Sequence, residues 1–381
     1  MLDRRWYIVA LVSLLVILAA CAPKSAPVSA PPIAAPQAVV PVPAPAGPAR
    51  SPEDIAWQKV VEAAQKEGSL TDYSSSFIIP PEMQQAFMAT TGVKLDVISG
   101  RGVEQVERLK TEKRMGSMLA DILDNNTTQM EEAKGLGLLA SSADLPVFRE
   151  RDVWNQEPLG LDREGKYLPY YIIYLAPHIN TKLVSTDDEA KLKSWRDFLD
   201  PKWKGKMVVQ DPRLGTMAAY FNVHLKKGLL DEAFMLALGR QQLQFALNKG
   251  DVAKAVAIGD APIALIAATS DTPAYIAQGL PVKMLDMKEG VWRGGAAVGR
   301  VEKSPHPNAA KVYLNWLFTP QGQTEISKAT LTQPIRKGVV DLRPEPLKAP
   351  VKNALDIDAE AIKWINAAVS EKTVISWLMP K

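Results

Sequence analysis

The chain has 381 residues, a formal net charge of +3 and 47% hydrophobic residues. This nearly even charge balance argues against nucleic-acid binding, which usually needs a strongly basic face. The length is enough for two or three domains of ordinary size.

The first 21 residues have the pattern of an exported lipoprotein. Two arginines are followed by a mainly apolar run at residues 6–20. As a helix this run would be roughly 22 Å long, short of the ~30 Å hydrocarbon core of a bilayer, so it is typical of a secretory signal peptide. It ends in Leu-Ala-Ala-Cys, which resembles the lipobox of bacterial lipoproteins; a chance cysteine beside an ordinary cleavage site is the alternative. We expect residues 1–20 to be removed and Cys21, the only cysteine, to be lipidated.

Residues 22–50 consist largely of Pro, Ala and Val, with nine prolines. This composition cannot bury a core and favours extended polyproline II structure. At about 3.1 Å per residue it could hold the folded part up to roughly 90 Å from the membrane. We interpret it as a tether, with a proline-rich recognition motif as the alternative. The protein is therefore expected to be exported and lipid-anchored, facing the periplasm or the cell exterior.

From Ser51 onward the chain alternates strands, polar loops and helices. Ser51-Pro52, with an acidic residue three positions after the serine, is typical of a helix start. Strands are then expected at 69–73, 93–97 and 121–123. This order indicates an α/β sheet with parallel strands, in which ligands bind at the carboxyl ends. We therefore expect one wall of a site in three loops, at 73–76, 99–102 and 124–128.

The second half of the chain repeats this order. Strands are expected at 170–173, 207–209 and 263–266. Polar loops that include Asp211–Thr216 and Thr269–Asp271 follow the last two of these strands. The pattern predicts a second lobe with its own wall.

Several stretches carry a resemblance to a known family. Residues 195–206 read Trp-Arg-Asp-Phe-Leu-Asp-Pro-Lys-Trp-Lys-Gly-Lys. Residues 294–298 read Gly-Gly-Ala-Ala-Val, residues 305–311 read Pro-His-Pro-Asn-Ala-Ala-Lys, and residues 321–323 read Gln-Gly-Gln. In this order and spacing they resemble the type II periplasmic solute-binding proteins, in the branch of ferric-ion, thiamine and phosphonate binders. The resemblance covers about residues 57–340.

The resemblance implies an α/β, two-lobed type II periplasmic-binding-protein (Venus-flytrap) fold whose hinge closes on a ligand. Lobe 1 would comprise residues 51–175 plus 295–330, and lobe 2 residues 176–294 plus 331–381 with the C-terminal helices. The function implied is that of a membrane-anchored receptor that captures a small solute for an ABC importer. Its partners would be that solute, an ABC permease and membrane lipid through Cys21. We expect a monomer with no nucleic-acid partner and no cofactor.

One departure separates this chain from the ferric binders. Those proteins carry adjacent tyrosines in the loop after the strand at 263–266, where this chain has Thr269 and Ser270. Neutral hydroxyls cannot replace phenolates as ligands of a hard cation such as ferric iron. Tyr171 and Tyr174 lie in the hinge strand instead, where sheet packing is the plainer interpretation. We therefore do not expect ferric iron to bind, and a ferric ion or another metal complex is the alternative ligand.

The sequence contains no recognisable catalytic constellation. His178, His224 and His306 lack the spacing of a metal site, and G-x-S-x-G, P-loop and Rossmann motifs are missing. We expect a binding protein rather than an enzyme, with no catalytic residue and no metal ligand. An enzymatic or signalling derivative of the fold is the alternative.

The candidate ligand-binding residues are hydroxyl, amide, arginine and aromatic side chains in the expected loops and at the hinge. They are Ser74, Ser75, Ser76, Arg101, Asn125, Asn126, Tyr174, Arg213, Gly215, Thr216, Thr269, Ser270, Trp292 and Arg293. Arginine suits a carboxylate or phosphate because its fork donates two parallel hydrogen bonds. We therefore expect an anionic, organic or phosphorylated solute. For each arginine a surface ion pair is the alternative, and Trp292 either covers the ligand or packs in the hinge.

Overall fold

The structure is a computed structural model that describes residues 51–75, 79–158, 162–214 and 217–379. Cys21, the predicted signal peptide and the predicted tether lie outside the described residues, as do Ser76, Gly215 and Thr216. In the described part no helix is both long and apolar enough to cross a membrane.

The first sheet contains the strands predicted in the first half of the chain. Its strand order is β2 (Lys94–Ser99), β1 (Ser69–Ser74), β3 (Ile122–Asn126), β12 (Ala296–Val301) and β4 (Leu139–Ala140), with β5 (Leu168–Pro169) also paired to β12. The pairs β1–β2 and β1–β3 are parallel as predicted, whereas β12 runs antiparallel to β3. The carboxyl ends of β1, β2 and β3 therefore lie together at one edge of this sheet.

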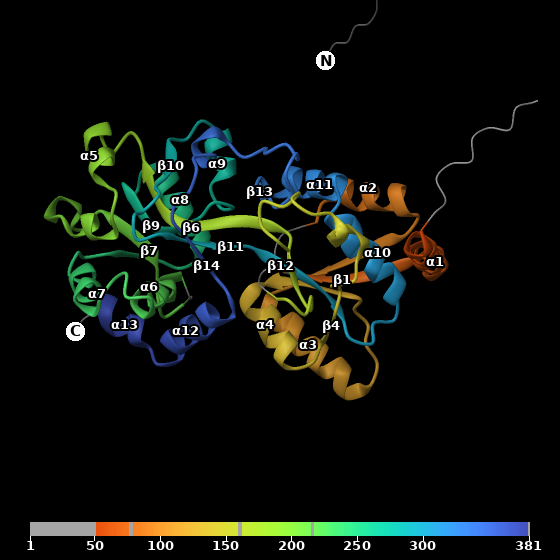
Figure 1. Cartoon of the computed structure of the whole chain (residues 1–381). Helices are drawn as coiled ribbons and strands as arrows, with labels where there is room; N and C mark the ends of the chain where they lie inside the picture. Colours follow the sequence, from red (N-terminus) through yellow and green to blue (C-terminus); the bar gives the residue numbers. More distant parts are fainter. Residues whose placement is uncertain (1–50, 76–78, 159–161, 215–216, 380–381) are drawn as a thin grey trace, which may run out of the picture. The chain divides into compact units, whose positions relative to one another are not determined.

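Helices cover both faces of the first sheet (Figure 1). They are α1 (Pro52–Glu67), α2 (Pro81–Thr91), α10 (Pro307–Leu317) and α11 (Pro320–Thr330) toward one side, and α3 (Gly102–Met115) and α4 (Thr127–Gly135) toward the other; a 3₁₀ turn, η1, spans Pro146–Arg149. The predicted start of α1 is confirmed, because Ser51 and Asp54 cap each other's backbone N–H groups. Gly68 ends this helix in the left-handed conformation. We refer to this sheet and its helices as lobe 1.

The second sheet is built from later strands. Its order is β14 (Ala354–Asp356), β11 (Val291–Gly294), β6 (Tyr171–Asn180), β9 (Ile263–Ala268), β7 (Met207–Gln210) and β8 (Gln244–Ala246), with β10 (Val282–Met284) and β13 (Gln333–Pro334) also paired to β6. All six residues of β9 are buried. A strand that is buried on both faces reads as a continuous apolar run, as this one does in the sequence.

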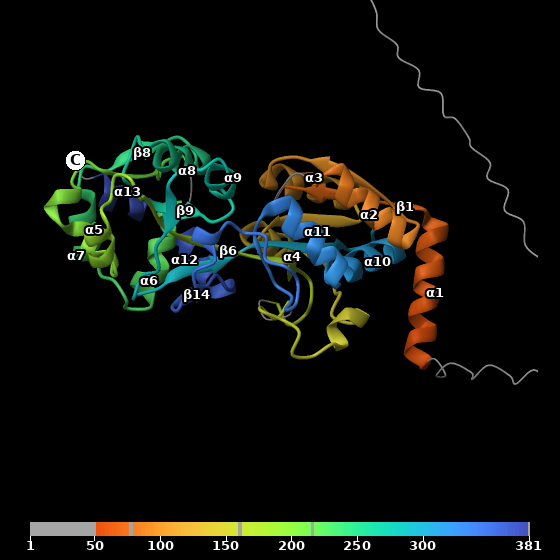
Figure 2. The same cartoon turned by 90° about the horizontal axis from the view of Figure 1, so that it is seen from above.

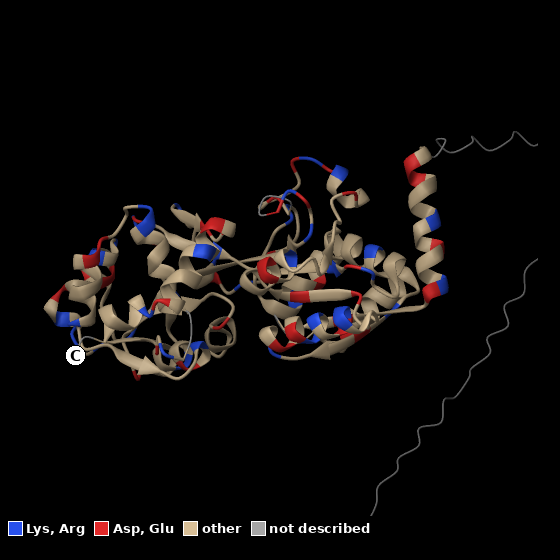
Figure 3. Cartoon of the chain, turned by 90° about the horizontal axis from the view of Figure 1, so that it is seen from below, with Lys and Arg blue, Asp and Glu red and all other residues tan. Residues whose placement is uncertain are grey.

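Helices also cover the second sheet, which together with them forms lobe 2. On one side lie α8 (Lys249–Ile258) and α9 (Pro273–Ala277), and on the other α6 (Phe221–Lys226), α7 (Glu232–Gly239), α12 (Ala359–Ser370) and α13 (Thr373–Leu378). The remaining elements are α5 (Thr186–Lys191) and the 3₁₀ turns η2 (Trp195–Leu199), η3 (Pro201–Trp203), η4 (Met217–Tyr220) and η5 (Glu345–Leu347). Acidic and basic positions are interspersed over both lobes (Figure 3).

The chain crosses between the sheets beside a glycine. From β5 it enters β6 at Tyr171, and from β11 it enters β12 through Gly295. Figure 2 shows from above the segments that cross between the two halves of the molecule. A Cβ on Gly295 would stand 2.1 Å from the carbonyl oxygen of Tyr171, so only glycine allows the two crossing strands to lie this close. The predicted lobe boundaries at 175/176 and 294/295 stay a prediction.

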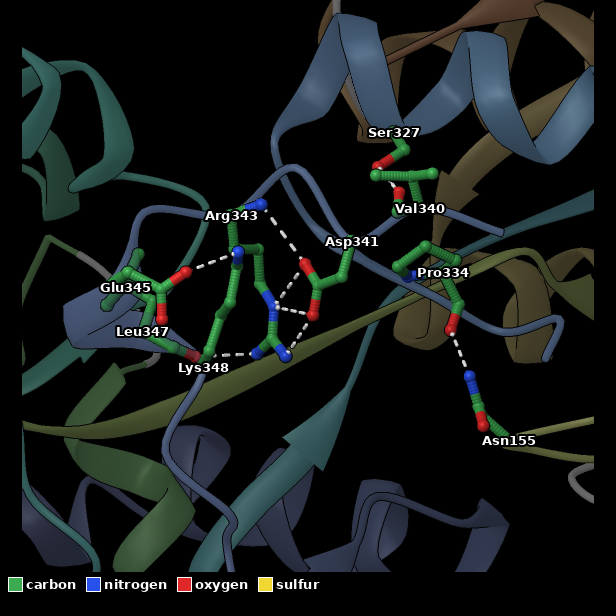
Figure 4. A network of polar contacts seen from close by, with 9 residues as sticks. All are labelled: Asn155, Ser327, Pro334, Val340, Asp341, Arg343, Glu345, Leu347 and Lys348. Atoms are coloured by element: carbon green, nitrogen blue, oxygen red, sulfur yellow. Dashed lines mark hydrogen bonds and ion pairs between the residues drawn. The ribbon is translucent and has the colours of Figure 1, made fainter. Parts of the chain in front are cut away.

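A third crossing leads from α11 to β14 and is held by polar contacts (Figure 4). The Ser327 hydroxyl donates to the Val340 carbonyl at 3.3 Å, which ties the segment to lobe 1. Farther along, the buried Arg343 guanidinium binds both carboxylate oxygens of Asp341 and donates to the Leu347 carbonyl at 2.7 Å. The segment that links α11 to β14 is therefore an ordered connection.

Candidate ligand-binding cleft

Two adjoining hollows lie between the lobes, where the strands cross. We call the larger one, of about 430 Å³, the polar hollow; it is lined by Ser75, Asn126, Lys249, Ser270, Asp271 and Thr332, among others. The second, of about 260 Å³, is the apolar hollow; on the lobe 2 side its lining includes Leu175, Met217, Tyr220, Ala268, Ile357 and Ile365. Asn126, Ile173, Lys249 and Gly295 line both. The two hollows therefore form one continuous cleft.

Neutral groups form the lobe 1 wall of the polar hollow. Ser75 follows β1, and both its N–H and its hydroxyl donate to the Asp124 carbonyl, at 2.9 and 3.2 Å. Asn126 ends β3 and caps α4, where its side-chain oxygen accepts the N–H groups of Thr128 and Gln129. These contacts fix the loops and leave a wall of hydroxyl and amide groups.

Charged groups form the lobe 2 wall. Lys249 begins α8, a helix that Asn248 caps by accepting the N–H of Asp251 at 2.9 Å. Asp271 follows β9, and its Oδ1 lies 3.4 Å from the Lys249 Nζ. The Lys249 side chain is 57% exposed, and Asp271 Oδ2 is buried without a hydrogen-bond partner in the described part of the chain. The wall thus offers a ligand one exposed ammonium group and one carboxylate whose side chain is 15% exposed.

Three of the predicted residues lie together in the polar hollow: Ser75, Asn126 and Ser270. Arg101 lines a neighbouring hollow that shares Asn126 with both others. Its side chain is 84% exposed and forms an ion pair with Glu104, the alternative that the sequence left open. Arg101 therefore stands at the rim of the cleft.

Four other predicted residues are buried and act inside their own lobes. Ser74 donates to the Asp124 carboxylate at 3.2 Å, and the Asn125 amide donates to the Gly102 carbonyl at 3.0 Å. The Thr269 hydroxyl accepts the N–H of Tyr174 at 3.0 Å. None of these four lines either hollow. They hold the loops and strands that carry the cleft residues.

Trp292 does not cover the cleft. Its side chain is fully buried in lobe 2, with ring centroids 5.2 Å from Trp195, 5.3 Å from Phe221 and 4.8 Å from His224. The interpretation of Trp292 as a lid over an organic ligand is therefore wrong in this structure, and the packing alternative holds. A tryptophan in a crossing strand gives the same sequence pattern whether its side chain faces the core or the cleft.

Arg213 and Arg293 are engaged by carboxylates of lobe 2. Arg293 binds both carboxylate oxygens of Asp356, at 2.6 and 2.9 Å. Arg213 forms an ion pair with the Asp211 carboxylate. Neither arginine lines the polar or the apolar hollow, so neither lies where it could bind an anion held there. The cation that does line both hollows is Lys249.

Sequence reasoning missed Lys249, Asp271 and Tyr171. A signal for Lys249 was present, since Asn248-Lys249-Gly250-Asp251 follows β8 with the same order of strand, polar loop and helix as the other site loops. The strand β8 has only three residues, too few to show an alternating pattern.

The hinge tyrosines have distinct surroundings. The Tyr170 hydroxyl donates to the Asp124 carboxylate at 2.9 Å, whereas Tyr171 lines the polar hollow. Burial raises the pKa of both phenols far above the physiological range. Among the described residues no group of three or more His, Cys, Asp and Glu side chains could hold a metal ion. The polar hollow thus brings together one tyrosine and one carboxylate rather than a ready set of anionic metal ligands.

Residues 82–354 match the family of bacterial extracellular solute-binding proteins. The chain belongs to this family. A protein of Salmonella typhi named for 2-aminoethylphosphonate binding in the periplasm is 26% identical over 312 residues, which cover 76% of this chain and 84% of that protein. Its counterpart in Salmonella typhimurium is 25% identical over 310 residues, with the same coverage.

Solved structures share the two-lobed fold. A Trichodesmium protein in complex with iron and citrate superposes with a TM-score of 0.65 at 20% identity, covering 82% of this chain and all of that one. An Actinobacillus pleuropneumoniae periplasmic binding protein with bound fructose-6-phosphate gives 0.58 at 18% identity, covering 83% of this chain and all of its own. The predicted family and fold are confirmed, and the protein is the solute-binding protein of an ABC importer, as predicted.

Proposed function

We propose that this solute-binding protein captures a small organic solute bearing both an anionic group and an amine, with aminophosphonates as the leading class. The observation that carries the proposal is the Lys249–Asp271 pair in the polar hollow, which combines an exposed ammonium with a partly exposed carboxylate that has one unsatisfied buried oxygen. A zwitterion complements both groups. The names of the Salmonella relatives support the same chemistry, because 2-aminoethylphosphonate carries one group of each charge.

Capture requires the solute to contact both lobes. Lys249 would hold the anionic group as a compact positive charge and Asp271 the amine, and the Asn126 amide of lobe 1 would donate to a remaining oxygen. A ligand that touches both walls favours the closed form through its differential affinity. Micromolar binding corresponds to about 8 kcal/mol, and a charge-assisted hydrogen bond contributes roughly 1.5–3 kcal/mol. A few such bonds are therefore sufficient for micromolar binding.

The test is a thermal-shift screen followed by calorimetric titration. 2-Aminoethylphosphonate should bind more tightly than ethylphosphonate, which lacks the amine, and than ethanolamine, which lacks the phosphonate. Lys249→Ala should weaken binding about tenfold or more, whereas Lys254→Ala, an exposed lysine on the same helix, should not. Binding confined to neutral solutes, or equal affinity in wild type and Lys249→Ala, would contradict the proposal. Mass spectrometry of ligand retained through gentle purification would identify the natural solute.

Ferric iron is the second candidate, favoured by the position of Tyr171 beside Asp271 in the polar hollow. Against it, burial raises the pKa of the Tyr171 phenol, so that forming a phenolate there is costly. We expect no coloured complex when ferric salt is added, with or without citrate. A visible charge-transfer band that disappears in Tyr171→Phe would instead favour iron as the ligand.

We also propose that Cys21 carries the lipid anchor and that binding is the only chemistry of the protein. The lipobox, signal-peptide pattern and proline-rich tether support the anchor. Cys21→Ser should release the protein from membranes or leave the precursor unprocessed. Unchanged fractionation and migration would contradict the anchor, and turnover of a bound solute would contradict the absence of catalysis.

A further inference from the structure

The apolar hollow shares Lys249 with the polar hollow but has a mainly hydrocarbon lining on its lobe 2 side. Its lobe 2 side is formed by buried side chains of four elements: Leu175 of β6, Ala268 of β9, Met217 of η4 and Ile365 of α12. Tyr220 of η4 adds a phenol whose pKa burial raises to about 12, so this ring stays neutral at physiological pH. The lobe 1 side is the start of α4. The lobe 1 residues Thr127, Thr128 and Gln129 are polar, so the hydrocarbon surface beside the charged wall lies on the lobe 2 side of the hollow.

The C-terminal part of the chain supplies much of this surface. Ile357, Ile365 and Asn366 line the hollow, yet all lie beyond residue 354, where the match to the family ends. Helix α12 packs against α6 and η4 of lobe 2 and also approaches α4 of lobe 1. The tail therefore contributes part of the cleft wall from residues outside the matched range.

Two residues of lobe 2, Arg293 and Asn222, hold this wall in place. Arg293 of β11 binds both carboxylate oxygens of Asp356, and its carbonyl accepts the N–H of Ile357 at 3.0 Å. Farther on, the Asn222 amide of α6 donates to the Trp364 carbonyl at 2.6 Å. These contacts give Arg293 a positioning role in place of the ligand contact expected from the sequence. They also keep Ile357 and Ile365 at fixed positions in the hollow.

We infer that the apolar hollow is a second subsite of the cleft, which selects solutes whose charged head carries a hydrocarbon or aromatic substituent of several carbon atoms. The inference rests on the proposed function, since the polar hollow must hold the head group. Asn126 and Lys249 line both hollows, so a head group beside Lys249 directs its substituent toward Ile365. Each methylene that moves from water into this surface should strengthen binding about threefold to fourfold.

The experiment measures affinity along two homologous series, 1-aminoalkylphosphonates and alkylcarboxylates with chains of one to eight carbons. Affinity should rise threefold to fourfold per methylene until the hollow is full and then level off or fall. Ile365→Gln should flatten this dependence while leaving the shortest member nearly unchanged. Val369→Gln, a partly exposed position on the same helix, should keep the wild-type dependence. If Ile365→Gln does not fold, Met217→Gln on η4 provides the same test.

The outcomes separate this inference from the proposed function. If no member of either series binds wild-type protein, the head-group assignment fails, and the subsite falls with it. If the shortest member binds but affinity stays flat along the chain, the subsite alone is overturned. A chain-length dependence that persists unchanged in both Ile365→Gln and Met217→Gln would also overturn it.

Discussion

Lobe 1 buries charge and presents a neutral wall to the cleft, whereas lobe 2 buries neutral rings and presents a charged wall. Inside lobe 1, Asp72 and Asp124 are both buried, and burial together with Asp124 raises the pKa of Asp72. Inside lobe 2, Trp195, Trp292 and His224 pack together. At the cleft, the charges of the hollows come from Lys249 and Asp271 of lobe 2. Selection of the solute should therefore depend mainly on lobe 2, and the two lobes should respond differently to pH.

The largest effect should come from truncating the aromatic centre of lobe 2. Trp292→Ala removes a fully buried ring from a packed cluster and should lower the free energy of unfolding by about 3–5 kcal/mol. Urea unfolding followed by circular dichroism measures the loss. Trp57→Ala, at a partly buried position of lobe 1, serves as the control and should cost less. A Trp292→Ala protein with native stability and lost solute binding would restore the ligand-covering role.

Acid should weaken lobe 2 through two buried histidines. Burial lowers the pKa of His178 and of His224 to about 4. In the unfolded chain both titrate near 6.5, so their contribution to stability is present above that pH and is lost as the pH falls toward 4. The loss should reach about 3 kcal/mol per histidine. Unfolding free energies at pH 7, 5.5 and 4.5 should show this slope, and His178→Gln with His224→Gln should flatten it; an unchanged slope would contradict the prediction.

In lobe 1, Asp72 should make the stability depend on pH with the opposite sign. Its pKa is raised in the folded state, so the folded protein loses stability as the pH rises through that pKa. Asp72 Oδ1 has no hydrogen-bond partner among the described residues. Asp72→Asn removes the buried charge and should stabilise the protein at pH 8 by about 1–3 kcal/mol, the usual cost of an unsatisfied buried polar group. A variant less stable than wild type at every pH would show that the carboxylate is favourable in place.

More of the fold than of the site could be predicted from the sequence. The order of strands, loops and helices depends on local sequence patterns. These patterns predicted the helix start at Ser51 and the strands β1, β2 and β3. Which polar side chain of a loop faces the cleft depends on contacts between distant segments. Asn125 and Asn126 are neighbours in sequence, yet one is buried beneath Gly102 and the other lines both hollows. The wall from α12 was likewise out of reach, because its approach to the cleft is set by tertiary packing.

The smallest effect should come from Arg213, one of the candidate ligand-binding arginines named from the sequence. Its guanidinium forms an ion pair with Asp211, its side chain is 60% exposed, and it lines neither hollow. Exposed ion pairs contribute little, since water screens them and two side chains must be ordered. Arg213→Ala should therefore change solute affinity by less than about threefold, like Arg149→Ala, whose ion pair with Glu53 belongs to lobe 1. Titration of both variants beside Lys249→Ala measures the difference. A loss at Arg213 as large as that at Lys249 would mean that closure brings this arginine onto the solute and that the charged wall extends to the loop after β7.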